Sequence, residues 1–136
     1  GYDTDAIYKA VSAFADDYNS VLSAAAKSKN SSVVSTASNM VQQTVANEKM
    51  LSKIGITIGE DNKLSVDEKK LKAADMTTVK SMMNGNGSFA YGVQTKASFI
   101  SMYAKNDQNK ASGVYGSSAT YTASLFSNGD IWNSFI

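Results

Sequence analysis

The feature that most constrains the fold is a series of apolar residues near the start of the chain, spaced alternately four and three positions apart. Its members are Ile7, Val11, Phe14, Tyr18 and Val21 or Leu22. This spacing places them on one side of an α-helix. Asp3 or Thr4 can cap the first turn. An isolated helix of this kind is marginal in water, so the helix predicted from Thr4 to about Ala26 must pack against other elements.

A second series of the same kind follows the polar segment 29–32. It comprises Val33 or Val34, Ala37, Met40 or Val41, Thr44, Glu48 and Leu51. The spacing predicts another helix of similar length. Because the connection is short, the two helices should lie antiparallel and bury their apolar sides against each other.

The pattern then changes to β-branched alternation. Residues 54–58 and 64–66 alternate, and residues 59–63 have the composition of a turn, which predicts a β-hairpin over about 54–66. Asp67 should cap a short helix from Glu68 to about Ala74. Asp75 should cap another through Met83.

A third long helix is predicted after the glycine-rich turn 84–87. Ser88 can cap it. Its apolar side toward Lys110 comprises Phe89, Val93, Ala97, Ile100 and Tyr103 or Ala104. Gly92 lies inside this helix and costs up to about 1 kcal/mol relative to alanine, unless a close neighbour uses the missing side chain. The fold class is therefore mainly α with a minor β part, an antiparallel bundle of three long helices and one hairpin over residues 1–110.

Residues 111–136 form a C-terminal tail of different composition. It is rich in Ser, Thr, Gly and Asn, and Asp130 is its only charged residue. Its aromatic residues are candidates for an interaction site, because aromatic side chains can anchor into a partner's grooves. They are Tyr115, Tyr121, Phe126, Trp132 and Phe135. In the alternative interpretation, this irregular tail packs on the bundle.

The composition disfavours catalysis and cofactor binding. The chain has no histidine and no cysteine, which removes the commonest general base and the commonest metal ligands. The adjacent pairs Asp16–Asp17 and Asp67–Glu68 point in different directions on a helix, so we expect solvated or capping roles. The acidic segment from Asp61 lacks the glycine and glutamate of a calcium loop and is interpreted as a turn followed by a helix cap. We predict no cofactor, no metal and no enzymatic activity.

The charge pattern also narrows the partners. There is no arginine, and the formal net charge is +1, so no basic stripe for nucleic acid is present. No apolar run reaches the length of a membrane span. We therefore expect a protein partner or self-association.

Part of the chain resembles the bacterial flagellar filament-cap protein family, also called hook-associated protein two. The resemblance covers about residues 6–90 and is closest in the segments 51–57, 61–67 and 79–85, although Asn62 stands where the family usually has glycine. The family's long C-terminal coiled-coil helix and globular insertions are not evident. The resemblance implies a non-catalytic protein that is exported, oligomerises at the filament tip and guides flagellin into place. It also implies an extracellular or flagellar location; if the resemblance does not hold, we expect a cytoplasmic protein.

Two functional hypotheses follow. The first is a non-catalytic structural or protein-interaction domain similar to part of the filament cap. The alternative is a small-ligand or glycan-binding module that uses the aromatic residues of the tail as stacking platforms.

Overall fold

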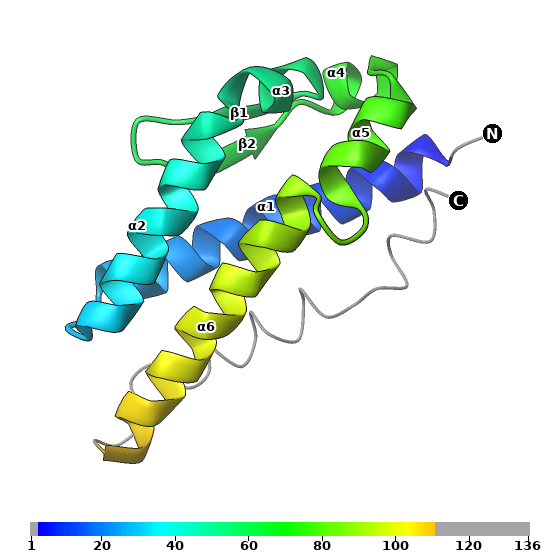
Figure 1. The fold of residues 1–136 in the computed structure, drawn as a ribbon. Helices are drawn as coiled ribbons and strands as arrows, with labels where there is room; N and C mark the ends of the chain where they lie inside the picture. Colours follow the sequence, from blue (N-terminus) through cyan, green and yellow to red (C-terminus); the bar gives the residue numbers. More distant parts are fainter. Residues whose placement is uncertain (1–2, 111–136) are drawn as a thin grey trace.

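The computed structural model describes residues 3–110 of the 136-residue chain. These residues form a helical bundle with a two-stranded antiparallel hairpin (Figure 1). In chain order the elements are α1 (Thr4–Ala26), α2 (Ser31–Ala46), α3 (Glu48–Lys53), β1 (Ile56–Ile58), β2 (Leu64–Val66), α4 (Glu68–Ala73), α5 (Met76–Met83) and α6 (Phe89–Lys110). The prediction of a mainly helical bundle of three long helices with one hairpin is confirmed.

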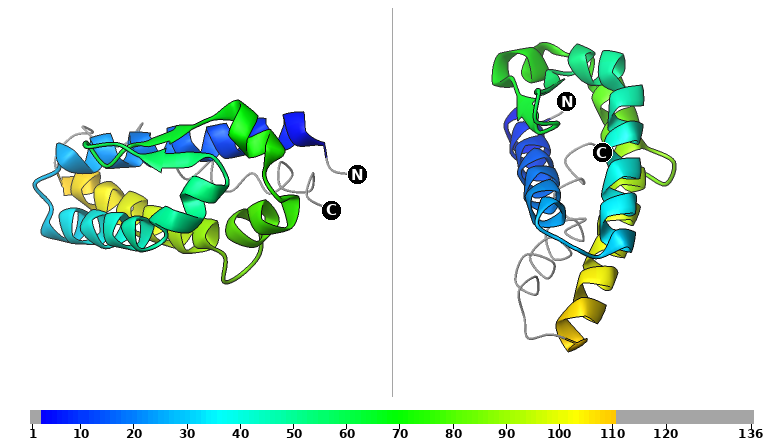
Figure 2. Two further views of the ribbon diagram at one scale, coloured as in Figure 1. Left: turned by 90° about the horizontal axis from the view of Figure 1, so that it is seen from above. Right: turned by 90° about the vertical axis from the view of Figure 1, so that its left-hand side faces the viewer.

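The long helices are arranged in two layers. Figure 2 shows α2 and α6 antiparallel and side by side in one layer, with α1 and the hairpin in the other. Most side chains predicted for the apolar sides are buried between the layers, and Ile7, Tyr18, Met40 and Val93 are fully buried. Glu48, which was predicted on the second stripe, is exposed instead. The first two helices were predicted to pack mainly against each other. In the structure α2 packs most extensively against α6, and α1 has a larger contact with β2 than with α2.

The predicted helix caps are confirmed by hydrogen bonds. The side chains of Asp3, Asp67, Asp75 and Ser88 accept hydrogen bonds from backbone N–H groups in the first turns of α1, α4, α5 and α6. Each bond satisfies a donor that has no partner within its own helix. The capping residues therefore fix where these helices begin.

The second predicted helix is interrupted at Asn47. This residue has φ −103° and ψ 12°, and it separates α2 from the short helix α3. Its side-chain amide donates a hydrogen bond to the Gln43 carbonyl oxygen at 2.8 Å. Asparagine side chains compete in this way with backbone N–H groups for helix carbonyls, which makes asparagine a poor residue for a helix interior. Leu51 is nevertheless buried as the periodicity predicted.

One asparagine of α1 forms two hydrogen bonds to the hairpin. Its strands pair in the register Ile56↔Val66, Thr57↔Ser65 and Ile58↔Leu64. Asn19 Nδ2 donates to the Leu64 carbonyl oxygen at 2.9 Å, and Asn19 Oδ1 accepts from the Leu64 N–H at 2.7 Å. The amide side chain thus satisfies both backbone groups of one strand residue, 45 positions away in the sequence.

Gly92 lies where α6 approaches α2. A Cβ atom at this position would collide with the side chain of Gln43. Gln43 Oε1 also accepts a hydrogen bond from Lys96 Nζ at 2.6 Å. Gly92 therefore has the close neighbour that was named as the exception to its cost in a helix.

Candidate functional site

In the layer formed by α2 and α6, charged residues are nearly absent from α2 and from the first four turns of α6, whereas the end of α6 carries Lys105, Asp107 and Lys110. No charged residue occurs from Ser31 to Ala46, and Lys96 is the only one from Phe89 to Ala104. Lys96 is half-buried and hydrogen-bonded to Gln43. Most of this layer's solvent-facing surface therefore carries no charge, in contrast to α1, α4 and the hairpin turn.

The solvent-exposed side of this layer is here termed the neutral face. It is formed by Ser35, Asn39, Gln42 and Ala46 of α2 and by Tyr91, Thr95, Ser98, Phe99 and Met102 of α6. On a helical wheel the α6 members lie opposite the buried Val93 and Ala97. Tyr91, Phe99 and Met102 are 47%, 46% and 46% exposed, respectively. Exposed aromatic and methionine side chains are enriched at the centre of protein interfaces, where charged residues are depleted.

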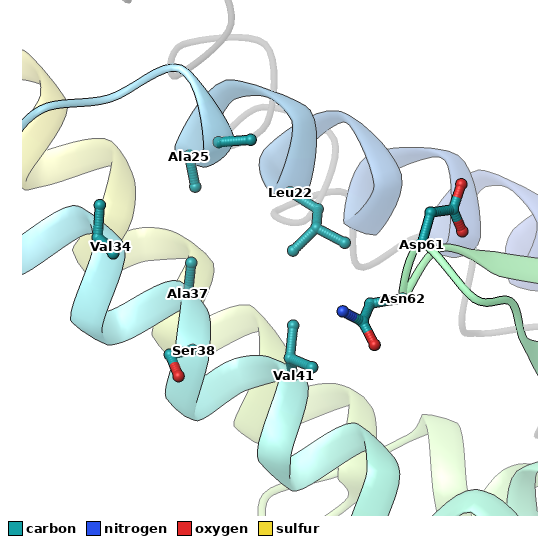
Figure 3. Close-up of a pocket in the computed structure, with 9 residues that line it drawn as sticks. Leu22, Ala25, Val34, Ala37, Ser38, Val41, Asp61 and Asn62 are labelled. Atoms are coloured by element: carbon teal, nitrogen blue, oxygen red, sulfur yellow. The ribbon is translucent and has the colours of Figure 1, made fainter.

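A groove opens between α1 and α2, next to the hairpin turn (Figure 3). It has a volume of about 360 Å³ and is lined by Leu22, Ala25, Ala26, Val34, Ala37, Ser38, Val41, Asp61 and Asn62. Apart from Ser38, its polar groups come from the turn, where Asp61 Oδ1 accepts from the Lys63 N–H at 3.0 Å. The groove can hold an apolar side chain, but it brings no pair of reactive groups together.

A second pocket, of about 430 Å³, is lined largely by hydroxyl groups. Its lining residues are Ser31, Ser32, Ser35, Thr36 and Tyr103. The Asn30 side chain already accepts from the N–H groups of Ser32 and Val33 at 2.8 and 3.1 Å, so these donors at the start of α2 are not free for an anion. The remaining hydroxyls suit a neutral, hydroxyl-bearing ligand.

One carboxylate is buried against expectation. Asp17 is 3% exposed, and its Oδ1 atom has no hydrogen-bond partner. Burial, with a smaller contribution from the neighbouring Asp16 charge, raises the pKa of Asp17 to about 7. The prediction of a solvated role is wrong for Asp17, although Asp16 is exposed as predicted.

The burial of Asp17 had a signal in the sequence. Ala10, Phe14, Asp17 and Val21 are separated by steps of four, three and four, and all four are buried. This row shares Phe14 and Val21 with the predicted apolar stripe on α1 and widens it by Ala10 and Asp17. A wider apolar face would therefore have included the carboxylate.

The other acidic candidates have the predicted local roles. Asp61 stabilises the hairpin turn, and Asp67 caps α4. Lys72 Nζ lies 2.6 Å from Asp5 Oδ1 and 3.3 Å from Glu68 Oε2, and its hydrogen bond and charge lower the pKa of Asp5. Within residues 3–110 no three acidic side chains gather in a way that could hold a metal ion.

The predicted interaction residues of the tail cannot be placed. Tyr115, Tyr121, Phe126, Trp132 and Phe135 lie outside the described residues. Among the described ones, the sequence reasoning missed the neutral face, because Tyr91, Phe99 and Met102 fall between the residues of the core stripe. Mapping the absence of charge onto both helices would have found it.

Comparisons with protein-family models, with characterised proteins and with solved structures find no match for this chain. None of the helices between residues 3 and 110 has both the length and the apolar character that a membrane crossing needs.

Proposed function

We propose that this chain is a non-catalytic structural or protein-interaction module, similar to part of the flagellar filament cap. The observation that carries this proposal is the neutral face. Soluble protein surfaces usually intersperse charges of both signs, whereas this face combines three half-exposed large apolar side chains with none. Contact with another protein would remove that apolar surface from water.

The chemistry of the described residues supports a binding role over a catalytic one. Asp17 has a perturbed pKa, but it lies on α1, outside the groove and the hydroxyl-lined pocket. Neither of these places a nucleophile beside a base, which is the arrangement that acid–base and covalent catalysis need. The helices and hairpin act in this proposal as a rigid support for an interaction surface.

The resemblance over about residues 6–90 gives this module its biological setting. In the filament-cap family the corresponding segment belongs to a protein that assembles at the filament tip and contacts flagellin. A similar module would bind flagellin or copies of itself, at an extracellular location. The aromatic residues of the tail, with Trp132 as the largest, form a second proposed contact element.

The test compares two double variants of the full chain. Phe99→Ser with Met102→Ser changes the neutral face, and Val34→Ser with Met50→Ser removes two partly exposed apolar side chains elsewhere, of 49% and 39% exposure. Self-association is measured by light scattering over a concentration series, and binding to purified flagellin by a surface biosensor. We expect the neutral-face variant alone to weaken at least one of these associations. A wild-type chain that is monomeric throughout and does not bind flagellin would overturn the proposal.

A second candidate function rests on the hydroxyl-lined pocket. Its four hydroxyl-bearing side chains and the Tyr103 ring suit a neutral glycan, since sugars pack on aromatic rings and hydrogen-bond to hydroxyls. Titration with neutral oligosaccharides, followed by NMR of backbone amides, should shift the signals of residues 31–36. These shifts should disappear in the Tyr103→Ala variant. If the oligosaccharides shift no signals of the wild-type protein, this function is excluded.

A further inference from the structure

We propose that the neutral face pairs with the neutral face of a second copy of this chain, in a two-fold symmetric dimer with α6 against α6. This inference rests on the proposed function and names its partner. The charge distribution is the first argument. In a two-fold contact every surface meets itself, so any charge near the axis meets the same charge of the second copy. Between Tyr91 and Met102 the face has no charged member: Lys96, at the level of the axis, is half-buried and bonded to Gln43, and the exposed Lys105 lies beyond the end of the face. Such a face can form this contact without strong repulsion, and the net charge of +1 gives only weak repulsion between whole chains.

The distribution of side chains on the face is the second argument. All three large apolar side chains lie on α6, whereas the exposed members from α2 are three polar residues and one alanine. Protein interfaces typically have an apolar centre surrounded by a polar rim. Placing α6 at the centre and α2 at the rim reproduces that arrangement. The contact between Phe99 and Tyr103, whose ring centroids are 6.5 Å apart, adds a partly rigid element to the centre.

The third argument is the surface area that the face could bury in a dimer. A large apolar side chain has about 200 Å² of surface, so three that are half-exposed offer roughly 300 Å². With the smaller members the face offers roughly 600 Å² per copy, or about 1,200 Å² in total, the lower end of specific interfaces. An interface of this size is typical of weak, transient association, so we expect a reversible dimer.

The symmetry predicts which residues meet. The face on α6 runs from Tyr91 to Met102, about 16 Å at the rise of an α-helix. A two-fold axis through its centre passes near Thr95 and Ser98. Ser98 is exposed, and in this dimer it lies close to Ser98 of the second copy. This proximity distinguishes the proposed arrangement from association through any other surface.

Single cysteines test this proximity directly. The chain contains no cysteine, so a disulfide in a single-cysteine variant can form only between copies. Its formation requires Cα atoms about 4.4–6.8 Å apart. Under mild oxidation we expect Ser98→Cys to form a covalent dimer rapidly. Ser81→Cys on α5 and Ser38→Cys in the groove, both exposed, are matched controls and should not.

Charge variants at the same position give a second test that does not depend on oxidation. Ser98→Lys and Ser98→Glu each place like charges together at the axis, so each should weaken self-association at least about tenfold. An equimolar mixture of the two should recover dimers in analytical ultracentrifugation, because the opposite charges then meet. The corresponding pair Ser81→Lys and Ser81→Glu should have no effect. Circular dichroism checks that each variant is folded.

The outcomes separate this inference from the proposed function. Rapid cross-linking at Ser98 together with recovery in the Lys and Glu mixture supports the α6 dimer. If instead the Ser81→Cys or Ser38→Cys variant cross-links and the charge variants at Ser98 do not change self-association, the α6 dimer is overturned, although the proposed interaction role stands. A monomeric chain whose flagellin binding is lost in the variant with Phe99→Ser and Met102→Ser also overturns it, since the neutral face then serves another protein. A chain that neither self-associates nor binds flagellin overturns both proposals.

Discussion

Replacing Asp17 by asparagine should remove a pH dependence of stability that this single carboxylate creates. The pKa of Asp17 is raised from 3.8 to about 7 by burial, so the folded protein holds this proton more tightly than the unfolded chain does. Stability is therefore highest below the unfolded pKa and falls as the pH rises through the folded pKa. It changes little at higher pH, because Asp17 is then ionised in both states.

The magnitude follows from the two pKa values. Relative to the fully protonated state, ionisation of Asp17 disfavours folding by about 2 kcal/mol at pH 5 and by about 4 kcal/mol at pH 8. The free energy of unfolding should therefore fall by about 2 to 3 kcal/mol between these pH values through Asp17 alone. Asp17→Asn cannot ionise, so its free energy of unfolding should lack this fall.

The assay is urea denaturation of the full chain, followed by circular dichroism at pH 5, 6, 7 and 8. The relevant quantity is the difference in pH dependence between wild type and variant, which cancels any constant cost of burying an amide. Asp16→Asn is the matched control: it removes an exposed neighbouring charge and should keep most of the fall. If wild type and Asp17→Asn show the same pH dependence, the burial of an unpartnered carboxyl at this position is refuted.

Three further substitutions test the contacts that hold the fold together. Asn19→Ala leaves both backbone groups of Leu64 without their partner and should cost about 2 kcal/mol in denaturation; a cost no larger than that of an exposed substitution would contradict the anchoring role. Gly55→Ala should cost about 2 to 4 kcal/mol, because φ is +87° and the new Cβ would lie 2.9 Å from a backbone nitrogen; a normal melting temperature would refute this. Gly92→Ala should be nearly neutral in the wild type, because the end of the Gln43 side chain must move away from Lys96 while alanine favours the helix; it should stabilise a Gln43→Ala background by up to about 1 kcal/mol, because only the helix preference remains. An equal effect in both backgrounds would show that Gln43 is not the neighbour that matters.

The parts of the fold that sequence predicted are those set by neighbouring residues. Asp3, Asp67, Asp75 and Ser88 cap their helices within two or three residues along the chain, so the spacing alone identifies them. Burial of Ile7 and Val93 follows equally from local periodicity. These features do not depend on which elements meet.

The parts that sequence did not predict depend on contacts between distant residues. An apolar stripe indicates that a helix packs against another element, but it does not indicate which one. The extensive contact between α2 and α6 could therefore not be inferred from the sequence. The role of Asn19 required knowing that Leu64 lies beside α1. Asp17 was interpreted by its charge, although its position in the row with Phe14 and Val21 determines its burial. The neutral face is also a property of two helices taken together.

The contact between Asn19 and Leu64 has a consequence for how the hairpin meets other proteins. A two-stranded sheet has two open edges, and an open edge is a template on which another chain can add a strand. In the hairpin, the N–H and C=O of Leu64 point away from β1 and are both bonded to the amide of Asn19. A side chain of α1 thus occupies the place that a third strand would take. It closes this part of the β2 edge against strand addition by another chain.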